Sequence, residues 1–313
     1  MDHFVAVTDS PAGDDLSTER SVLSGMRVEK VAWHDELSLS AAIRNADAVM
    51  CMHAPITRSV LQSLSRCRLI ARFGTGLDNI DLGVAKAVGI PVIGINGYCT
   101  KEVADHAMAL LLSWHRKVAE HHRFVVENRW AESGHTTGNG SCGILTRLSE
   151  QTVGILGFGQ IGQAFARRAV AFEMKVLVHS RHPNQEVAMQ LGVECTDLDD
   201  LLRRSDYVSL HIPLKNDTRH IMNKETVSFM KSGAVLINTS RGGLVDENAL
   251  AHALREGRLG GALLDVFEHS PLPSDHAFRA LKNVILTPHV SFYSEDSLIE
   301  LRRRTAEAVL NYL

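Results

Sequence analysis

Short apolar runs bounded by turn residues alternate with segments of helical period along the whole chain. The runs are FVAVT, AVMCM, RLIARFG, PVIGI, TVGILG, MKVLVH, YVSLHI, AVLINT, GALLDV and NVILTP. Such alternation is typical of repeated β-α-β units, in which helices cover both faces of a parallel sheet. The pattern therefore predicts an α/β fold.

Two segments of the chain resemble each other and suggest two similar sheets. ADAVMCMHAPIT and SDYVSLHIPLKN share four residue types in the same order: Asp47, Val49, His53 and Pro55 in the first, and Asp206, Val208, His211 and Pro213 in the second. The chance similarity of two generic β-α units is the alternative. Because 313 residues are twice the ~150 residues of a single-domain prior, we predict two open-sheet domains, divided near residue 98.

The longest helical pattern covers residues 100–128. It is predicted as one helix that Thr100 caps and that connects the domains, with one apolar face formed by Val103, Ala107, Leu110, Leu111 and Trp114. The following ESGHTTGNGSCG is rich in Gly, Ser and Thr, and is expected to be an exposed loop or a segment that embraces a partner. A second helix, capped by Ser294, ends the chain.

The composition argues against several classes of protein. Five scattered cysteines without a C-x-x-C pair indicate a reducing compartment, and a net charge of −3 with interspersed signs gives no footprint for nucleic acid. The longest apolar run, ALLLSW, is too short to span a bilayer, and the first residues lack the features of a secretory signal. His121 and His122 have no metal-ligand spacing around them. We expect a soluble cytoplasmic protein with no metal, membrane or nucleic-acid partner.

A glycine fingerprint follows the strand predicted for TVGIL. Gly157, Gly159 and Gly162 form G-x-G-x-x-G at the start of a segment of helical period. In that context the first glycine permits a tight turn, the second lets the backbone approach a pyrophosphate, and the third lets the helix meet the strand. The motif predicts a dinucleotide site, and a merely structural glycine turn is the alternative.

The acidic residue expected at the end of the next strand is absent. Ser180 occupies that place in VLVHSRHPN, and Arg181 and His182 follow it. A carboxylate there would hydrogen-bond the ribose hydroxyls of NAD and repel a 2′-phosphate, whereas an arginine attracts that phosphate. The segment therefore favours NADP, and the alternative is a solvent-facing arginine with the ribose held by other groups.

Three titratable or charged residues follow three successive strands of the second sheet: Arg241, Glu268 and His289. Ligands of open parallel sheets bind at the carboxyl ends of the strands, so we expect these side chains at one edge. Arg241 can clamp a carboxylate and polarise a carbonyl, and His289 can exchange a proton with the alkoxide. Glu268 beside His289 would raise its pKa and orient it. The set suits hydride transfer to a 2-keto acid.

The first half of the chain offers a candidate substrate loop. RFGTGLDNID places Gly74 and Gly76 around Thr75, before a helix that Asp78 is expected to cap. Free backbone N–H groups in such a turn could hold the substrate carboxylate. A plain capped turn is the alternative.

The motifs together resemble one known family. RFGTGLDNID, VADHAMALLL, GILGFGQIG, INTSRGGLVDENAL, LLDVFE and LTPHVSFYS are similar, in order and over nearly the whole chain, to the D-isomer-specific 2-hydroxyacid dehydrogenases. The resemblance implies two Rossmann-like or flavodoxin-like open-sheet domains with the active site in a cleft between them. Residues 1–98 and 290–313 would form the substrate domain, and residues 99–289 the coenzyme domain, through which a homodimer would form.

The resemblance also implies roles for particular residues. Arg241, Glu268 and His289 would be catalytic, and Thr75 and Gly76 would contact the substrate. The dinucleotide would lie against Gly157, Gly159, Gln160, Ile161, Gly162, Ser180, Arg181, His182, His211, Pro213, Thr218, Thr239, Ser240 and Asp265, the last of these near the nicotinamide.

Two segments depart from the usual sequence of the family, and they indicate two different functions. SRH is similar to the NADP-using glyoxylate and hydroxypyruvate reductases, and predicts a reductase of small 2-keto acids that prefers NADP, with NAD as the alternative cofactor. PHVSFYSEDSLIELR resembles the C-terminal-binding-protein branch, which includes dinucleotide-sensing corepressors. The intact trio of Arg241, Glu268 and His289 favours the enzyme, since a binding scaffold has no physical need of all three.

Overall fold

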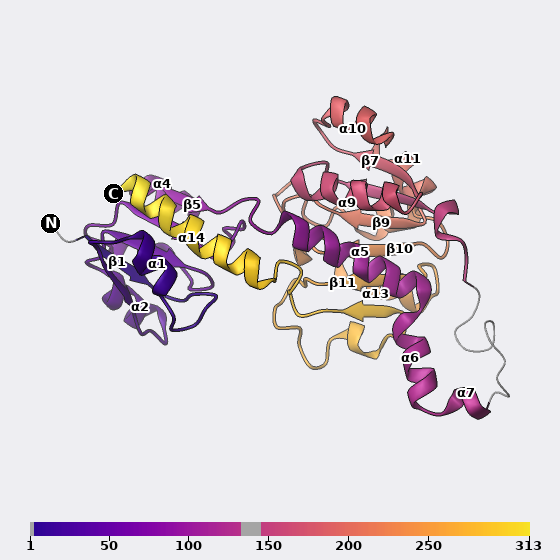
Figure 1. The fold of residues 1–313 in the computed structure, drawn as a ribbon, viewed down its shortest axis with the longest axis horizontal. Helices are drawn as coiled ribbons and strands as arrows, with labels where there is room; N and C mark the ends of the chain where they lie inside the picture. Colours follow the sequence, from indigo (N-terminus) through magenta and orange to yellow (C-terminus); the bar gives the residue numbers. More distant parts are fainter. Residues whose placement is uncertain (1–2, 133–144) are drawn as a thin grey trace. The chain divides into compact units, whose positions relative to one another are not determined.

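The computed structural model describes residues 3–132 and 145–313, which fall into two units (Figure 1). Unit 1 contains the described residues up to Cys99 together with Tyr293–Leu313, and unit 2 is Thr100–Phe292. Within these residues no helix combines the length and the apolar character needed to cross a bilayer.

Unit 1 is built on a parallel sheet in the order β2-β1-β3-β4-β5. Its strands are β1 (Phe4–Val7), β2 (Arg27–Lys30), β3 (Ala48–Cys51), β4 (Leu69–Arg72) and β5 (Val92–Gly94). Its helices are α1 (Ser17–Val22), α2 (Glu36–Ile43), α3 (Arg58–Ser63), α4 (Leu82–Ala87) and α14 (Glu295–Tyr312). Alternate strand residues pack into two cores, one with α2, α3 and α4 and the other with α1 and α14.

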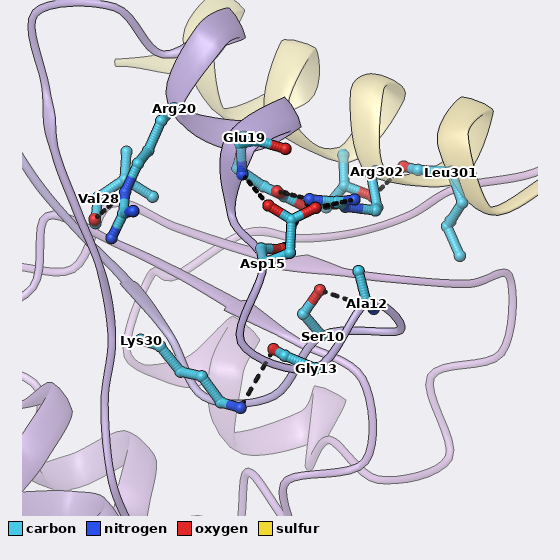
Figure 2. A network of polar contacts seen from close by, with 12 residues as sticks. Ser10, Ala12, Gly13, Asp15, Glu19, Arg20, Val28, Lys30, Leu301 and Arg302 are labelled. Atoms are coloured by element: carbon cyan, nitrogen blue, oxygen red, sulfur yellow. Dashed lines mark hydrogen bonds and ion pairs between the residues drawn. The ribbon is translucent and has the colours of Figure 1, made fainter.

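A buried ion pair attaches the C-terminal helix to unit 1. Arg302 of α14 donates through Nε and Nη2 to the two carboxylate oxygens of Glu19 in α1, at 2.8 and 2.7 Å, and Nη2 also donates to the carbonyl of Asp15 at 2.7 Å (Figure 2). Ser294 caps α14 as predicted, since its side chain accepts from the N–H of Ser297. The end of the chain is therefore part of the same fold as its beginning.

Unit 2 contains a parallel sheet in the order β12-β11-β10-β9-β6-β7-β8. Its strands are β6 (Thr152–Leu156), β7 (Lys175–His179), β8 (Glu194–Cys195), β9 (Tyr207–Leu210), β10 (Val235–Asn238), β11 (Gly261–Leu264) and β12 (Val284–Leu286). Its described helices are α5 (Thr100–Arg116), α6 (Val118–Val126), α7 (Arg129–Glu132), α9 (Gln160–Ala171), α10 (Gln185–Leu191), α11 (Leu198–Arg204), α12 (Lys224–Phe229) and α13 (Glu247–Arg255), with short 3-10 turns η1 (Leu148–Glu150), η2 (Gly242–Leu244) and η3 (Ala277–Ala280).

The strand order of unit 2 reverses beside β6. β7 and β8 extend the sheet on one side of β6, and β9 to β12 extend it on the other. Helices α5, α9 and α10 cover one face, and α11, α12 and α13 cover the other. Such a reversal leaves room for a ligand at the carboxyl ends of the two central strands. Both sheets are parallel and covered on both faces, which confirms the predicted α/β class of two open-sheet domains.

The prediction of one continuous helix over residues 100–128 is wrong. Thr100 is itself the first helical residue, and the segment is divided into α5, α6 and α7. Lys117 and Asn128 interrupt it with left-handed backbone angles, φ 54° and 60°. Of the glycine-rich segment predicted after this helix, all but Glu132 lies outside the described residues.

Candidate active site

The glycine fingerprint forms the turn between β6 and α9. Gly157 has φ 99°, and a Cβ there would stand 2.3 Å from the carbonyl oxygen of His211, the residue after β9. A Cβ at Gly162 would stand 2.0 Å from the carbonyl oxygen of Gly157. A Cβ at Gly159, the N-cap of α9, would meet no atom within 4 Å. The fold therefore requires glycine at 157 and 162, whereas at 159 the protein itself does not require it. Gln160 and Ile161 begin α9.

Two buried polar atoms at the same edge of the sheet have no hydrogen-bond partner within the described part of the chain. They are Nδ1 of His211, after β9, and the hydroxyl of Thr239, after β10. The other ring nitrogen of His211 lies 2.9 Å from the hydroxyl of Ser209, and burial lowers the pKa of His211 to about 4, so the ring is neutral near pH 7. Buried polar atoms are rarely left unpaired, so this edge fits a polar ligand.

Other predicted cofactor residues use their polar groups to hold loops. The Thr218 hydroxyl donates to the carbonyl of Pro213 and accepts from the N–H of Lys215, both at 2.7 Å. The Ser240 hydroxyl donates to the carbonyl of Leu210 at 2.7 Å. These hydroxyls fix the loops after β9 and β10.

The segment after β7 contains a charge partner that sequence reasoning missed. Nη2 of Arg181 lies 2.5 Å from Oδ2 of Asp217, in the loop after β9. Ser180 is half-buried at the end of the strand, and His182 is exposed. This pair could not be found from the sequence, because Asp217 reaches the end of β7 from the loop after another strand.

The turn that contains Arg241 is closed by a buried amide. Asn238, the last residue of β10, accepts from the N–H of Ser240 at 3.0 Å and donates to the carbonyl of Arg241 at 2.9 Å. A Cβ at the next residue, Gly242, would stand only 1.9 Å from the carbonyl carbon of Phe267 and 2.3 Å from the backbone nitrogen of Glu268. Glycine at 242 therefore lets the turns of Arg241 and Glu268 touch.

The carboxylate of Glu268 has partners other than the expected one. Its Oε1 hydrogen-bonds Nε2 of His220 and lies 3.8 Å from Nη1 of Arg219. The backbone N–H of Glu268 donates to Glu247 at 3.0 Å. His220 was not singled out from the sequence; it reaches Glu268 because its own N–H donates to the carbonyl of Gly243 at 2.9 Å.

His289 lies in a turn that a buried carboxylate organises. Asp265, fully buried after β11, accepts from the Thr287 hydroxyl at 2.5 Å and from the N–H groups of Val290 and Ser291 at 3.0 and 2.9 Å. Nε2 of His106, from α5, lies 3.1 Å from the Thr287 hydroxyl. His289 itself has φ 56°. Asp265 was predicted near the nicotinamide, and the three hydrogen bonds that its carboxylate accepts come from the turn of His289.

The predicted substrate loop lies in unit 1, after β4. The Thr75 hydroxyl donates to the carbonyl of Ile95 at 2.9 Å, and Gly76 is partly exposed. The expected cap, Asp78, is wrong: the N-cap of α4 is Asp81, whose carboxylate accepts from the N–H of Val84 at 2.9 Å. The helix begins later because residues 77–80 form a separate turn, in which the N–H of Ile80 donates to the carbonyl of Leu77 at 3.1 Å.

The chain has clear relatives. The family model for D-isomer specific 2-hydroxyacid dehydrogenase, NAD binding domain, matches residues 108–291. The chain belongs to this family. A glyoxylate reductase of Korarchaeum cryptofilum is 39% identical over 287 residues, which cover 90% of this chain and 84% of the relative.

Solved structures of similar proteins have the same fold. A D-lactate dehydrogenase from Aquifex aeolicus, complexed with NAD and lactic acid, matches with a TM-score of 0.85 and 30% identity over 98% of this chain and 95% of its own. An acyclic imino acid reductase in complex with NADPH and D-Arg matches with a TM-score of 0.85 and 28% identity over 99% and 96%. The predicted family and its oxidoreductase chemistry on 2-keto and 2-hydroxy acids are confirmed, and the corepressor alternative is not favoured.

Proposed function

We propose that this dehydrogenase reduces glyoxylate, hydroxypyruvate or a similarly small 2-keto acid to the D-2-hydroxy acid, with NADPH preferred over NADH. The observation that carries the proposal is the contact of the Arg241 and Glu268 turns through Gly242, at the sheet edge where the strand preceding His289 also ends. The relatives named glyoxylate reductase support the choice of small acids.

The residues around β6 and β9 fit a dinucleotide. Gly159 leaves open space at the start of α9, where backbone N–H groups would bind the pyrophosphate. The unpaired atoms of His211 and Thr239 would find polar partners on the same ligand. The bound nicotinamide supplies the hydride in reduction.

The remaining chemistry belongs to side chains of the protein. The Arg241 guanidinium would bind the substrate carboxylate and polarise the adjacent carbonyl oxygen. His289 would donate a proton to that oxygen as it becomes an alkoxide, and Glu268 would orient and stabilise the protonated imidazole. Thr75 and Gly76 are proposed as substrate contacts on the resemblance.

We also propose an oligomeric state and a cellular compartment. A homodimer through unit 2 is supported by four apolar side chains of α6 and α7 that are about half exposed or more, namely Val118, Val125, Val126 and Trp130. The four described cysteines are free, in keeping with a reducing compartment such as the cytoplasm. Light scattering of the purified protein measures the oligomeric state.

Initial rates with each coenzyme test the proposed substrate class. NADPH and NADH are to be paired in turn with glyoxylate, hydroxypyruvate, pyruvate and bulkier 2-keto acids. We expect the highest kcat/KM for a two- or three-carbon acid with NADPH. A higher kcat/KM for branched or aromatic acids, or for NADH, would overturn the corresponding part of the proposal.

A further inference from the structure

Arg181 is already engaged by a carboxylate. Its Nη2 lies 2.5 Å from Oδ2 of Asp217, and both side chains are more than half exposed, at 63% and 54%. Exposed ion pairs are weak because water and salt screen them. A ligand group with more charge than a carboxylate can therefore replace Asp217 as the partner of Arg181.

The pair connects two strands that are not neighbours. Arg181 follows β7 and Asp217 lies in the loop after β9, and β6 stands between these strands in the sheet. The pair thus joins the two sides of the point where the strand order reverses. Open sheets bind dinucleotides at that point, with the adenosine ribose near the end of the second strand, here β7.

The loop that presents Asp217 is held in place. The Thr218 hydroxyl bonds both Pro213 and Lys215, and the N–H of Arg219 donates to the carbonyl of Lys215 at 2.9 Å. The hydrogen bond from Arg181 lowers the pKa of the Asp217 carboxyl below its ordinary value of 3.8, so the group is ionised near neutral pH. A fixed negative charge therefore faces the region of the ribose.

We propose that Asp217 supplies, from the loop after β9, the carboxylate that the fingerprint lacks after β7, and that Asp217 and Arg181 set the choice of coenzyme in opposite directions. This inference rests on the proposed function. A ribose 2′-hydroxyl can donate to the Asp217 carboxylate, which favours NADH. A 2′-phosphate takes the Arg181 donors and is repelled by Asp217, so the arginine favours NADPH and the aspartate limits that preference.

Binding titrations of purified variants test this assignment without turnover. Dissociation constants of NADPH and NADH are measured by nicotinamide fluorescence in the wild type, Asp217→Asn, Arg181→Ala and the double variant. We expect Asp217→Asn to raise the ratio Kd(NADH)/Kd(NADPH) by about three- to tenfold, and Arg181→Ala to lower it by a similar factor. In the double variant the effect of Asp217→Asn on NADPH should shrink, because the freed guanidinium is gone.

A control variant removes an aspartate from another aspartate–arginine pair. Asp105, whose side chain is 66% exposed, pairs at 2.7 Å with the less exposed Arg168, between α5 and α9, and Asp105→Asn should leave the ratio unchanged. An unchanged or lowered ratio in Asp217→Asn would overturn the role of Asp217. An unchanged ratio in Arg181→Ala would overturn the role of Arg181. A wild-type Kd(NADH)/Kd(NADPH) below one would instead overturn the NADPH preference of the proposed function, so its failure is read from the wild type and not from the variants.

Discussion

Asp265 and Asn238 hold the turns of the two residues to which the main chemistry is assigned. Asp265 binds the turn of His289 through three donors, and Asn238 closes the turn of Arg241. The reactive residues could be predicted from the sequence because they follow strands of one parallel sheet. The residues that hold or pair with the site residues could not, since each reaches its partner from a distant segment: His106 reaches Thr287, His220 reaches Glu268 and Asp217 reaches Arg181.

Replacement of Asp265 should weaken both the fold and the activity. In Asp265→Asn an amide N–H₂ would face at least one of the three donors, so we expect the free energy of unfolding to fall by about 1–3 kcal/mol. Because His289 shares the turn, kcat should fall as well. Urea unfolding and initial rates measure the two effects, with the exposed Asp275→Asn as control. Wild-type stability and kcat would show that the turn does not depend on Asp265.

His211 predicts a particular pH dependence of stability. Burial lowers its pKa from 6.5 to about 4. As the pH falls below 6.5 the unfolded chain takes up the proton while the folded protein does not, so stability is lost between these two values. The loss should reach roughly 3 kcal/mol at the acid end. Urea unfolding near neutral pH and near pH 5 should give a smaller loss for His211→Gln than for the wild type; equal losses would contradict the assignment.

The ten apolar runs all contain strands, and the two strands that the pattern missed are both at sheet edges. β2 has only Val28 buried, and β8 is two residues long. With at most one buried residue each, these two edge strands lack the apolar signal of the central strands. The predicted long helix failed for a local reason, the left-handed angles at Lys117 and Asn128, which hydrophobic periodicity does not record.

In the glycine fingerprint, we expect one glycine to be required for ligand binding and another for the fold. Gly159→Ala introduces a Cβ with no protein atom within 4 Å, so its stability should equal that of the wild type. Its affinity for NADPH should fall by at least about tenfold, because the backbone must approach the pyrophosphate. Gly162→Ala, whose Cβ would stand 2.0 Å from a carbonyl oxygen, should instead lower stability by about 1–3 kcal/mol. Fluorescence titration and urea unfolding distinguish the two; unchanged NADPH affinity in Gly159→Ala would count against a pyrophosphate site.

Loss of the buried ion pair of the C-terminal helix should lower the stability of the protein. Arg302→Met leaves the fully buried Glu19 charge without its partner, and we expect a loss of about 3–5 kcal/mol. Arg303→Met, one residue along α14, removes an exposed pair with Glu300 and should change stability very little. Urea unfolding compares the two variants. Equal stabilities would mean that Arg302 does not anchor α14.

The two units share one structural feature, a hydrogen bond between an aspartate and the start of the neighbouring strand, which accounts for the similarity of their sequences. Asp47 precedes β3 and accepts from the N–H of Phe4 at the start of β1, and Asp206 precedes β9 and accepts from the N–H of Thr152 at the start of β6, both at 2.8 Å. In each unit these strands are neighbours in the sheet. The sequence repeat thus marks the same pairing in two sheets. Long-range register of this kind could be predicted only where the segments themselves look alike.

The central claim is that His289 exchanges the proton while other residues bind the coenzyme. The most direct test measures kcat with glyoxylate and NADPH in His289→Ala, alongside the Kd of NADPH in the same preparation. We predict that kcat falls by about 10²- to 10⁴-fold while the Kd stays close to that of the wild type. A kcat like that of the wild type would contradict the acid–base role of His289.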